Sequence, residues 1–239
     1  MKSIITHPVI GDIEFCTRRN VRGTHFRVTA ERVCITTHPL LARSVFPLSD
    51  ERVAWILNAQ HALAHKTTTP AYNFAPHSTL KTNRFVVRFA PDDSLRTTFA
   101  ARRTDDALTI AFRPECDFAS SANQRKIRHL IAHFLKIEAQ QILPARLQTL
   151  ADTYGFAFAQ VRINSAQTRW GSCSAKRVIN LSYNLMLLPD ELIDFVLVHE
   201  LCHTREMNHG ARFKQLMTGI FANYTALNAA LKQYRPLQP

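Results

Sequence analysis

Residues 198–203 read Val-His-Glu-Leu-Cys-His, and they contain the pattern His-Glu-x-x-His at His199, Glu200 and His203. In an α-helix, residues i and i+4 lie one turn apart on the same face. Two imidazoles at that spacing can bind one Zn²⁺, and Glu200 lies one residue further round the helix, within reach of a water on the metal. Zinc lowers the pKa of such a water, so the pattern predicts Glu200 as a general base.

The residues before this pattern predict a buried helix. Pro189 followed by Asp190 and Glu191 is a strong helix start, and residues 192–201 are apolar nearly all round the helix. We expect this helix to run to about Met207. Burying two histidines and a glutamate without partners is costly, and a metal ion supplies the partner. The alternative is a buried, hydrogen-bonded His/Glu cluster that holds no metal.

A catalytic zinc site needs a third protein ligand and an open position. His199, His203 and Glu206 would lie in a row of about 10.5 Å on a straight helix that rises 1.5 Å per residue, which is too long for one ion. His209 can reach the metal if the helix ends first and the chain turns back, and Asn208 tolerates the left-handed conformation that ends a helix. We therefore predict His209 as the third ligand. The alternative is a surface His209 and a distant acidic ligand.

Two other histidine pairs share the i, i+4 spacing, namely His61/His65 and His129/His133. Neither pair has a glutamate after its first histidine or an obvious third ligand. We interpret both as ordinary histidines on helix faces. Cys202 lies between the zinc ligands in sequence but faces away from both, so we interpret it as a packing residue.

The composition of the chain excludes several classes of protein. Its 239 residues are 46% hydrophobic and 20% charged, which suits a folded core and excludes a disordered or collagen-like chain. No apolar run approaches the ~18 residues of a membrane span, and no signal-peptide core is visible, so we expect a cytoplasmic protein without a membrane partner. The five scattered cysteines contain no C-x-x-C pair, which fits reduced thiols.

The charge of the chain is strongly positive. Thirty Lys and Arg residues against eighteen Asp and Glu residues give a net charge of +12 and a pI near 10.0. Such a charge favours nucleic acid, nucleotides or another anionic partner. A solvated basic surface without a dedicated partner explains the charge equally well, because the positive residues are spread along the chain.

Periodicity and turn signals predict an α+β fold in two parts. Residues 1–120 form a β-rich amino-terminal part with one helix, which begins after the predicted N-cap Ser49 and ends near Lys66. Within this part the polar stretch 67–84 is the best internal boundary. Residues 121–239 form a metallohydrolase domain with the His-Glu-x-x-His helix packed on a small sheet.

The second part opens with a long helix from about Ser121 to Tyr154, closed by Gly155. Residues 169–174, Arg-Trp-Gly-Ser-Cys-Ser, are expected to form a Gly-Ser turn at a strand end. There Arg169 could hold an oxyanion, a carboxylate or a phosphate over the metal, or it could form a structural salt bridge. We interpret Trp170 as a core residue.

These segments together resemble the YgjP-like family of bacterial zinc metallopeptidases, which is related to the SprT-like and WLM proteases. The resemblance is carried by Arg169–Ser174, Ile179–Leu181, Pro189, Val198–His203, Asn208–Gly210 and Phe213, and more weakly by Arg18–Asn20 and Arg27–Val28. Residues 67–120 carry none. The resemblance implies a minimal zincin core: a small sheet, the His-Glu-x-x-His helix and a third histidine shortly after it.

The leading hypothesis is a zinc-dependent hydrolase, a metallopeptidase that acts on a peptide or protein. Its zinc ligands would be His199, His203 and His209. Glu200 would be the general base, and Arg169 is a second catalytic candidate. Two alternatives stay open. The same metal could serve cleavage of a nucleotide phosphoanhydride, which the basic charge and Arg169 favour. A nucleic-acid-binding protein with a structural zinc site would need a fourth ligand, for which the sequence offers no convincing candidate, and would leave Glu200 without a task.

Overall fold

The computed structural model describes residues 2–29, 32–64 and 72–238, without the side chains of 61–64. The chain divides into two compact units, Met1–Thr69 and Pro70–Pro239. This division falls in the polar stretch 67–84, whereas the expected division at 120/121 lies inside the second unit. Lys66 and His65 lie outside the described residues. None of the helices in the described ranges has the length and apolar character of a membrane span.

The first unit is a four-stranded sheet with one helix. Its elements are β1 (Lys2–His7), β2 (Gly11–Thr17), β3 (Thr24–Val28), β4 (Val33–Thr37), the 3-10 helix η1 (Pro39–Ser44) and α1 (Asp50–Ala64). The sheet order is β1-β2-β4-β3, with β2 and β4 parallel and the outer pairs antiparallel. Alternate residues of β2 and β4, such as Ile13 and Ile35, are fully buried and pack with Ile56 of α1.

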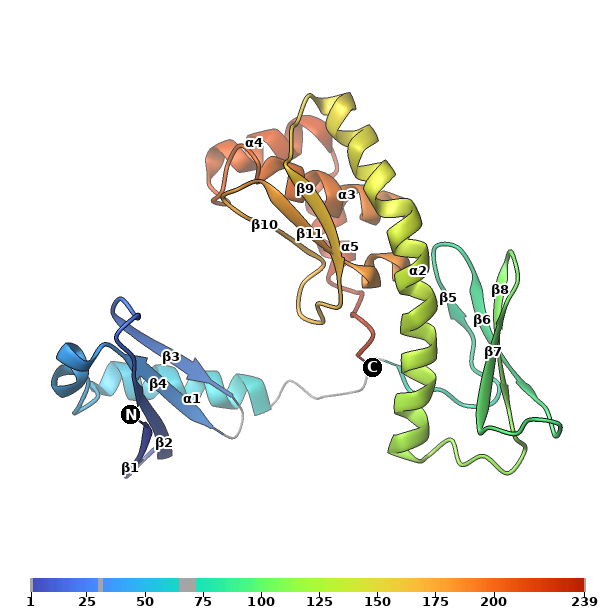
Figure 1. The fold of residues 1–239 in the computed structure, drawn as a ribbon. Coiled ribbons are helices and arrows are strands. Elements are labelled where there is room, and N and C mark those ends of the chain that lie inside the picture. The colour runs from blue at the N-terminus through green and yellow to red at the C-terminus, as the bar shows by residue number, and fades with distance from the viewer. Residues whose placement is uncertain (1, 30–31, 65–71, 239) are drawn as a thin grey trace. The chain divides into compact units, whose positions relative to one another are not determined.

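The second unit contains two sheets and a long helix, α2 (Ser121–Tyr154) (Figure 1). The first sheet has the order β5-β6-β8-β7, with β6 and β8 parallel. Its strands are β5 (Leu80–Lys81), β6 (Val86–Pro91), β7 (Phe99–Arg103) and β8 (Ala107–Phe112). The second sheet has the order β10-β11-β9, with β11 parallel to β9 and antiparallel to β10. Its strands are β9 (Gln160–Asn164), β10 (Gly171–Cys173) and β11 (Val178–Ser182).

The remaining helices follow the second sheet. They are the 3-10 helix η2 (Tyr183–Leu187), α3 (Asp190–Cys202), α4 (Ala211–Ile220) and α5 (Tyr224–Leu231). Helix α3 contacts α2, β10, α4 and α5. This position explains why α3 is apolar nearly all round, and it presents the His-Glu-x-x-His residues at the end of a buried helix.

A single hydrophobic core runs through the second unit. It joins Phe85 and Ile110 of the first sheet, Ile131 and Leu143 of α2, and Leu197 of α3. In Figure 1, α2 lies between the sheet of β5–β8 and the segment that carries β9–β11 and α3. Residues 72–120 therefore share a core with the part that carries the His-Glu-x-x-His residues, and a boundary at 120/121 would divide that core.

The α+β prediction is confirmed, as are the bounds of α2 and its cap, Gly155, whose φ is 66°. Three details differ from expectation. Helix α3 ends at Cys202 and not near Met207. Gly171–Cys173 is a strand paired with β11 and not a turn. The turn of that hairpin lies at 174–177, where Arg177 has a φ of 56° and donates its backbone N–H to Ser174 at 2.8 Å.

Candidate metal centre

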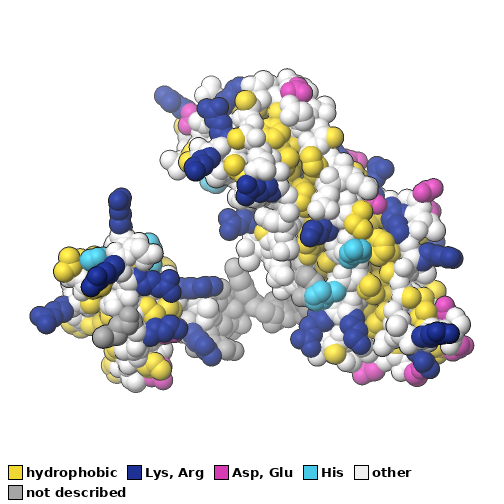
Figure 2. Space-filling model, in the orientation of Figure 1, with side chains coloured by type: hydrophobic (Ala, Val, Ile, Leu, Met, Phe, Trp, Pro, Cys, Tyr) yellow, Lys and Arg dark blue, Asp and Glu magenta, His cyan; other side chains and the backbone are white. Residues whose placement is uncertain are grey.

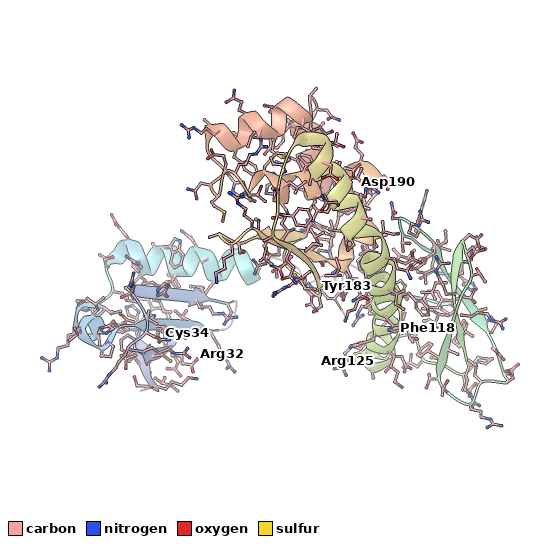
Figure 3. The ribbon with its side chains drawn as sticks, turned by 45° about the horizontal axis from the view of Figure 1, so that its top comes forward. Arg32, Cys34, Phe118, Arg125, Tyr183 and Asp190 are labelled. Carbon is pink, nitrogen blue, oxygen red and sulfur yellow. The ribbon has the colours of Figure 1, made fainter. Side chains whose placement is uncertain are left out.

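Ion pairs and a buried apolar surface fix helix α3 on α2. Pro189 precedes the helix in an extended conformation, and Asp190 and Glu191 occupy its first turn. Arg146 of α2 donates to the Asp194 carboxylate at 2.6 Å and also pairs with Asp190. Figure 3 shows Asp190 beside α2. The Arg146 guanidinium therefore holds the start of α3 through the carboxylates of Asp190 and Asp194. This attachment determines the position of the last turn of the helix.

The chain reverses directly after α3. The carbonyl of Cys202 accepts the backbone N–H groups of Arg205 and Glu206 at 3.0 and 2.9 Å, and the Thr204 hydroxyl donates to the Leu201 carbonyl at 2.7 Å. These bonds satisfy carbonyls that the ended helix leaves open. The reversal therefore comes before Asn208, which was expected to make it and which has no positive φ.

The reversal brings three imidazoles together. The Nε2 atom of His199 lies 3.2 Å from Nε2 of His203 and 3.1 Å from Nε2 of His209, and ligand atoms of all three histidines lie within 4.8 Å of one another. Ligands about 2.0–2.1 Å from a tetrahedral zinc ion are about 3.3 Å apart, so the cluster fits that ion. No other group of this kind occurs in the described part of the chain.

The environment of His199 and His203 favours the neutral imidazole, which is the form that binds metal. Burial, and then the neighbouring His203 and His209, lowers the pKa of His199 to about 4. Burial also lowers the pKa of His203. The Nδ1 atom of His203 lies 3.0 Å from the carbonyl oxygen of Glu206, so an Nδ1–H donor there leaves the Nε2 lone pair for a metal.

Glu200 lies beside the cluster and is nearly inaccessible, with 5% of its surface exposed. Its Oε2 atom is buried and has no hydrogen-bond partner among the described residues. Burial raises the pKa of Glu200 to about 7, while the positive charge of Arg169 acts to lower it. A carboxyl group with this pKa can take up and release a proton near neutral pH.

Arg169 is exposed, and within the described ranges it forms no ion pair, so the salt bridge considered from the sequence is not observed. Hydrogen bonds to Ser182, the last residue of β11, hold the loop that carries Arg169. The Ser182 hydroxyl donates to the Ala166 carbonyl and the Ser182 N–H to the Trp170 carbonyl, both at 2.8 Å. Trp170 packs against the core, as expected. Cys202 is also fully buried, and burial raises its pKa to about 12, so it is a packing residue.

A family model of the YgjP-like metallopeptidase domain matches residues 27–234. The chain belongs to the YgjP-like family. Membership of this family assigns the chain to the metal-dependent peptidases. The match also spans residues 67–120, for which the sequence analysis found no resemblance. Arg18–Asn20 precedes the matched range.

Two solved structures resemble parts of this YgjP-like chain. One is the metallopeptidase zymogen abylysin of Pyrococcus abyssi, with 20% identity and a TM-score of 0.36 over 38% of this chain and 93% of that one. The other is the metallopeptidase zymogen jannalysin of Methanocaldococcus jannaschii, with 18% identity and a TM-score of 0.34 over 36% and 90%. A search among curated proteins found no match.

The structure of this YgjP-like protein places two further residues at the site, Phe213 and Gly171, for which the sequence pattern predicted no role there. Phe213 of α4 is 1% exposed, and its ring centroid lies 4.9, 4.6 and 4.8 Å from those of His199, His203 and His209. Gly171 of β10 makes room for Glu200. The sequence carries a signal for each residue: the aromatic Phe213 follows His209 by four residues, and a glycine within a strand marks a close approach.

The other histidine pairs do not join the centre. His129 and His133 are exposed on α2 and line a different cavity. His65 and the side chain of His61 lie outside the described residues.

Proposed function

We propose that this chain is a zinc-dependent peptidase in which His199, His203 and His209 bind the metal and Glu200 is the general base. The observation that carries the proposal is the convergence of three ring nitrogens beside a buried carboxylate with an unpartnered oxygen. Three imidazoles are a donor set that suits zinc. Zinc held there would supply Lewis acidity toward a substrate carbonyl and would acidify a water.

The protein's own residues would then handle protons and charge. Glu200 has a pKa of about 7, so near neutral pH it can accept a proton at Oε2 and later deliver it to the leaving amine. Arg169, which is exposed and unpaired among the described residues, is suited to hold a substrate oxygen that carries negative charge. We propose a peptide or protein as the substrate.

One alternative keeps the same centre but cleaves a nucleotide phosphoanhydride, and the unpaired cation of Arg169 favours it. A structural zinc site is less well supported, because the cluster in the described residues offers three ligands and not four.

All five cysteines are free. Free thiols support the cytoplasmic location expected from the sequence.

The deciding experiment is activity profiling of the zinc-loaded protein against a peptide library and a set of nucleoside triphosphates. We expect peptide cleavage that stops with a chelator and returns with zinc. Hydrolysis of nucleotides alone would replace the peptidase proposal with the alternative. Full activity after complete removal of metal would contradict both.

A further inference from the structure

A second cavity lies far along α2 from the metal centre. It has a volume of about 990 Å³ and lies between the first half of α2 and residues 96–99, which lead into β7. We call it the α2 groove. Its charged and titratable lining residues are Arg96, Arg125, Lys126, His129 and His133. Figure 3 shows Arg125 at the start of α2, and Figure 2 shows histidine side chains beside hydrophobic ones over the same helix.

The lining of the α2 groove itself is basic, although the adjoining cavity, which shares Arg96 with it, is also lined by Glu115 and Asp117. No acidic residue lines the α2 groove. Arg96, Arg125 and Lys126 are exposed, and within the described ranges their side chains form neither an ion pair nor a hydrogen bond. The Nδ1 atom of His129 lies 2.9 Å from the Arg125 carbonyl, which leaves its Nε2 atom open. The groove therefore presents free donors and positive charge to a ligand.

The rest of the lining combines apolar and hydroxyl side chains. Leu130, Phe99 and Ala122 are apolar, and Thr97 and Thr98 carry hydroxyl groups. A cavity of this size is at the upper end of the ~300–1,000 Å³ found for ligand pockets, so a single small anion would fill only a fraction of it. A ligand that matches this mixture of cationic and apolar side chains carries both carboxylates and apolar side chains.

We propose that the α2 groove docks an acidic, partly apolar peptide segment of a protein substrate. As a substrate site it rests on the proposed peptidase function. From His133 to Gly155 the helix rises about 33 Å at 1.5 Å per residue, and Gly155 accepts a hydrogen bond from Arg205, two residues after the ligand His203. An extended peptide covers that distance with about ten residues. A substrate can thus be held at the groove while a distant bond is cleaved.

Nucleic acid fits the groove less well. Sites for single strands combine cations with exposed aromatic rings on which bases stack. The one Phe, Tyr or Trp among the lining residues is Phe99, which is 9% exposed and packs in the core. The α2 groove has the cations for a phosphate backbone but no such platform.

The test is a binding titration with a fluorescent twelve-residue peptide of Glu, Asp and Leu. The zinc-loaded, full-length Glu200→Gln protein is used so that the probe is not cleaved. Arg125→Glu and Lys126→Glu should each weaken binding about 3- to 10-fold, because exposed charge pairs are individually weak, and raised salt should weaken it further. Lys136→Glu reverses one exposed charge on the same helix outside the groove and should change affinity less than about 2-fold.

Three results would overturn the inference. They are no peptide binding at low salt, equal losses in Lys136→Glu and Arg125→Glu, or tighter binding of a single-stranded or duplex oligonucleotide that Arg125→Glu weakens. Arg125→Gln, which removes the charge without reversing it, replaces Arg125→Glu if that variant unfolds. The titration measures binding and not turnover. If the peptide binds but the unsubstituted protein cleaves no peptide, the proposed function is refuted and the docking site is not.

Discussion

Gly171→Ala tests whether the position of Glu200 determines activity. A Cβ atom on Gly171 would lie 2.7 Å from Oε1, 2.8 Å from Cγ and 2.9 Å from Cδ of Glu200, whereas ordinary contact begins at 3.4 Å. The carboxylate must therefore retreat by about 0.7 Å at Oε1. Displacements near 1 Å at a reacting group cost about 10²-fold in rate. We expect kcat to fall between about 10- and 100-fold on a cleaved peptide.

Zinc content separates this effect from loss of the site. The three heavy atoms nearest the added methyl all belong to Glu200 and none to a histidine, so Gly171→Ala should keep about one zinc per chain. Overpacking should cost about 1–3 kcal/mol of unfolding free energy. Gly219→Ala is the matched control, because a Cβ there meets nothing within 4 Å. If Gly171→Ala retains full kcat with zinc bound, the placement of Glu200 against β10 is irrelevant and the reasoning fails.

Four further predictions concern the same centre. Glu200→Gln should keep zinc and lower kcat by about 10²–10⁴-fold, measured as turnover beside metal content; lost zinc would make Glu200 a ligand. His209→Ala should lose zinc and activity together while His129→Ala loses neither, and metal analysis that finds zinc in the first variant would exclude His209 as a ligand. Phe213→Ala should destabilise the fold by about 3–5 kcal/mol in denaturant titration and weaken zinc binding, and unchanged zinc affinity would show that the ring does not position the imidazoles. In the metal-free Glu200→Gln protein, the unfolding free energy should fall as pH drops from 6.5 toward 4. The folded-state pKa of His199 is about 4, so its stabilising contribution is present above 6.5 and is lost as pH falls through 4; a thermal midpoint that is flat over this range would contradict a buried neutral His199.

The local pattern predicted the centre because helical spacing alone places His199 and His203 on one face. The structure also brings His209 beside His199, as expected if the chain turns back after the helix. The predicted end of helix α3 near Met207 was wrong, because the contacts that hold the chain after Cys202 are made with residues distant in sequence. Arg205 donates to the Gly155 carbonyl and lies over the Phe156 ring, 4.4 Å from its centroid. The residues next to Cys202 include no glycine or proline that would have predicted a helix end there.

The strand β10 was missed for a similar reason. Its three residues pair with β11 through backbone hydrogen bonds, and a Gly-Ser pair has no intrinsic preference for a strand. The turn itself uses Arg177 in the left-handed region, where sequence analysis looks for glycine. The sequence does not show that residues on both sides of 120/121 share one core, because burial around α2 depends on which sheets pack there.

The continuous core around α2 has a practical consequence for fragment design. A fragment that starts at residue 121 would lose the sheet of β5–β8 and expose Ile127 and Ile131, which the intact protein fully buries. Exposed apolar stripes of this kind promote aggregation during expression. A fragment that starts at residue 72 keeps both sheets on α2. The smallest piece that could be produced for enzymology is therefore much longer than the segment that carries His199, His203 and His209.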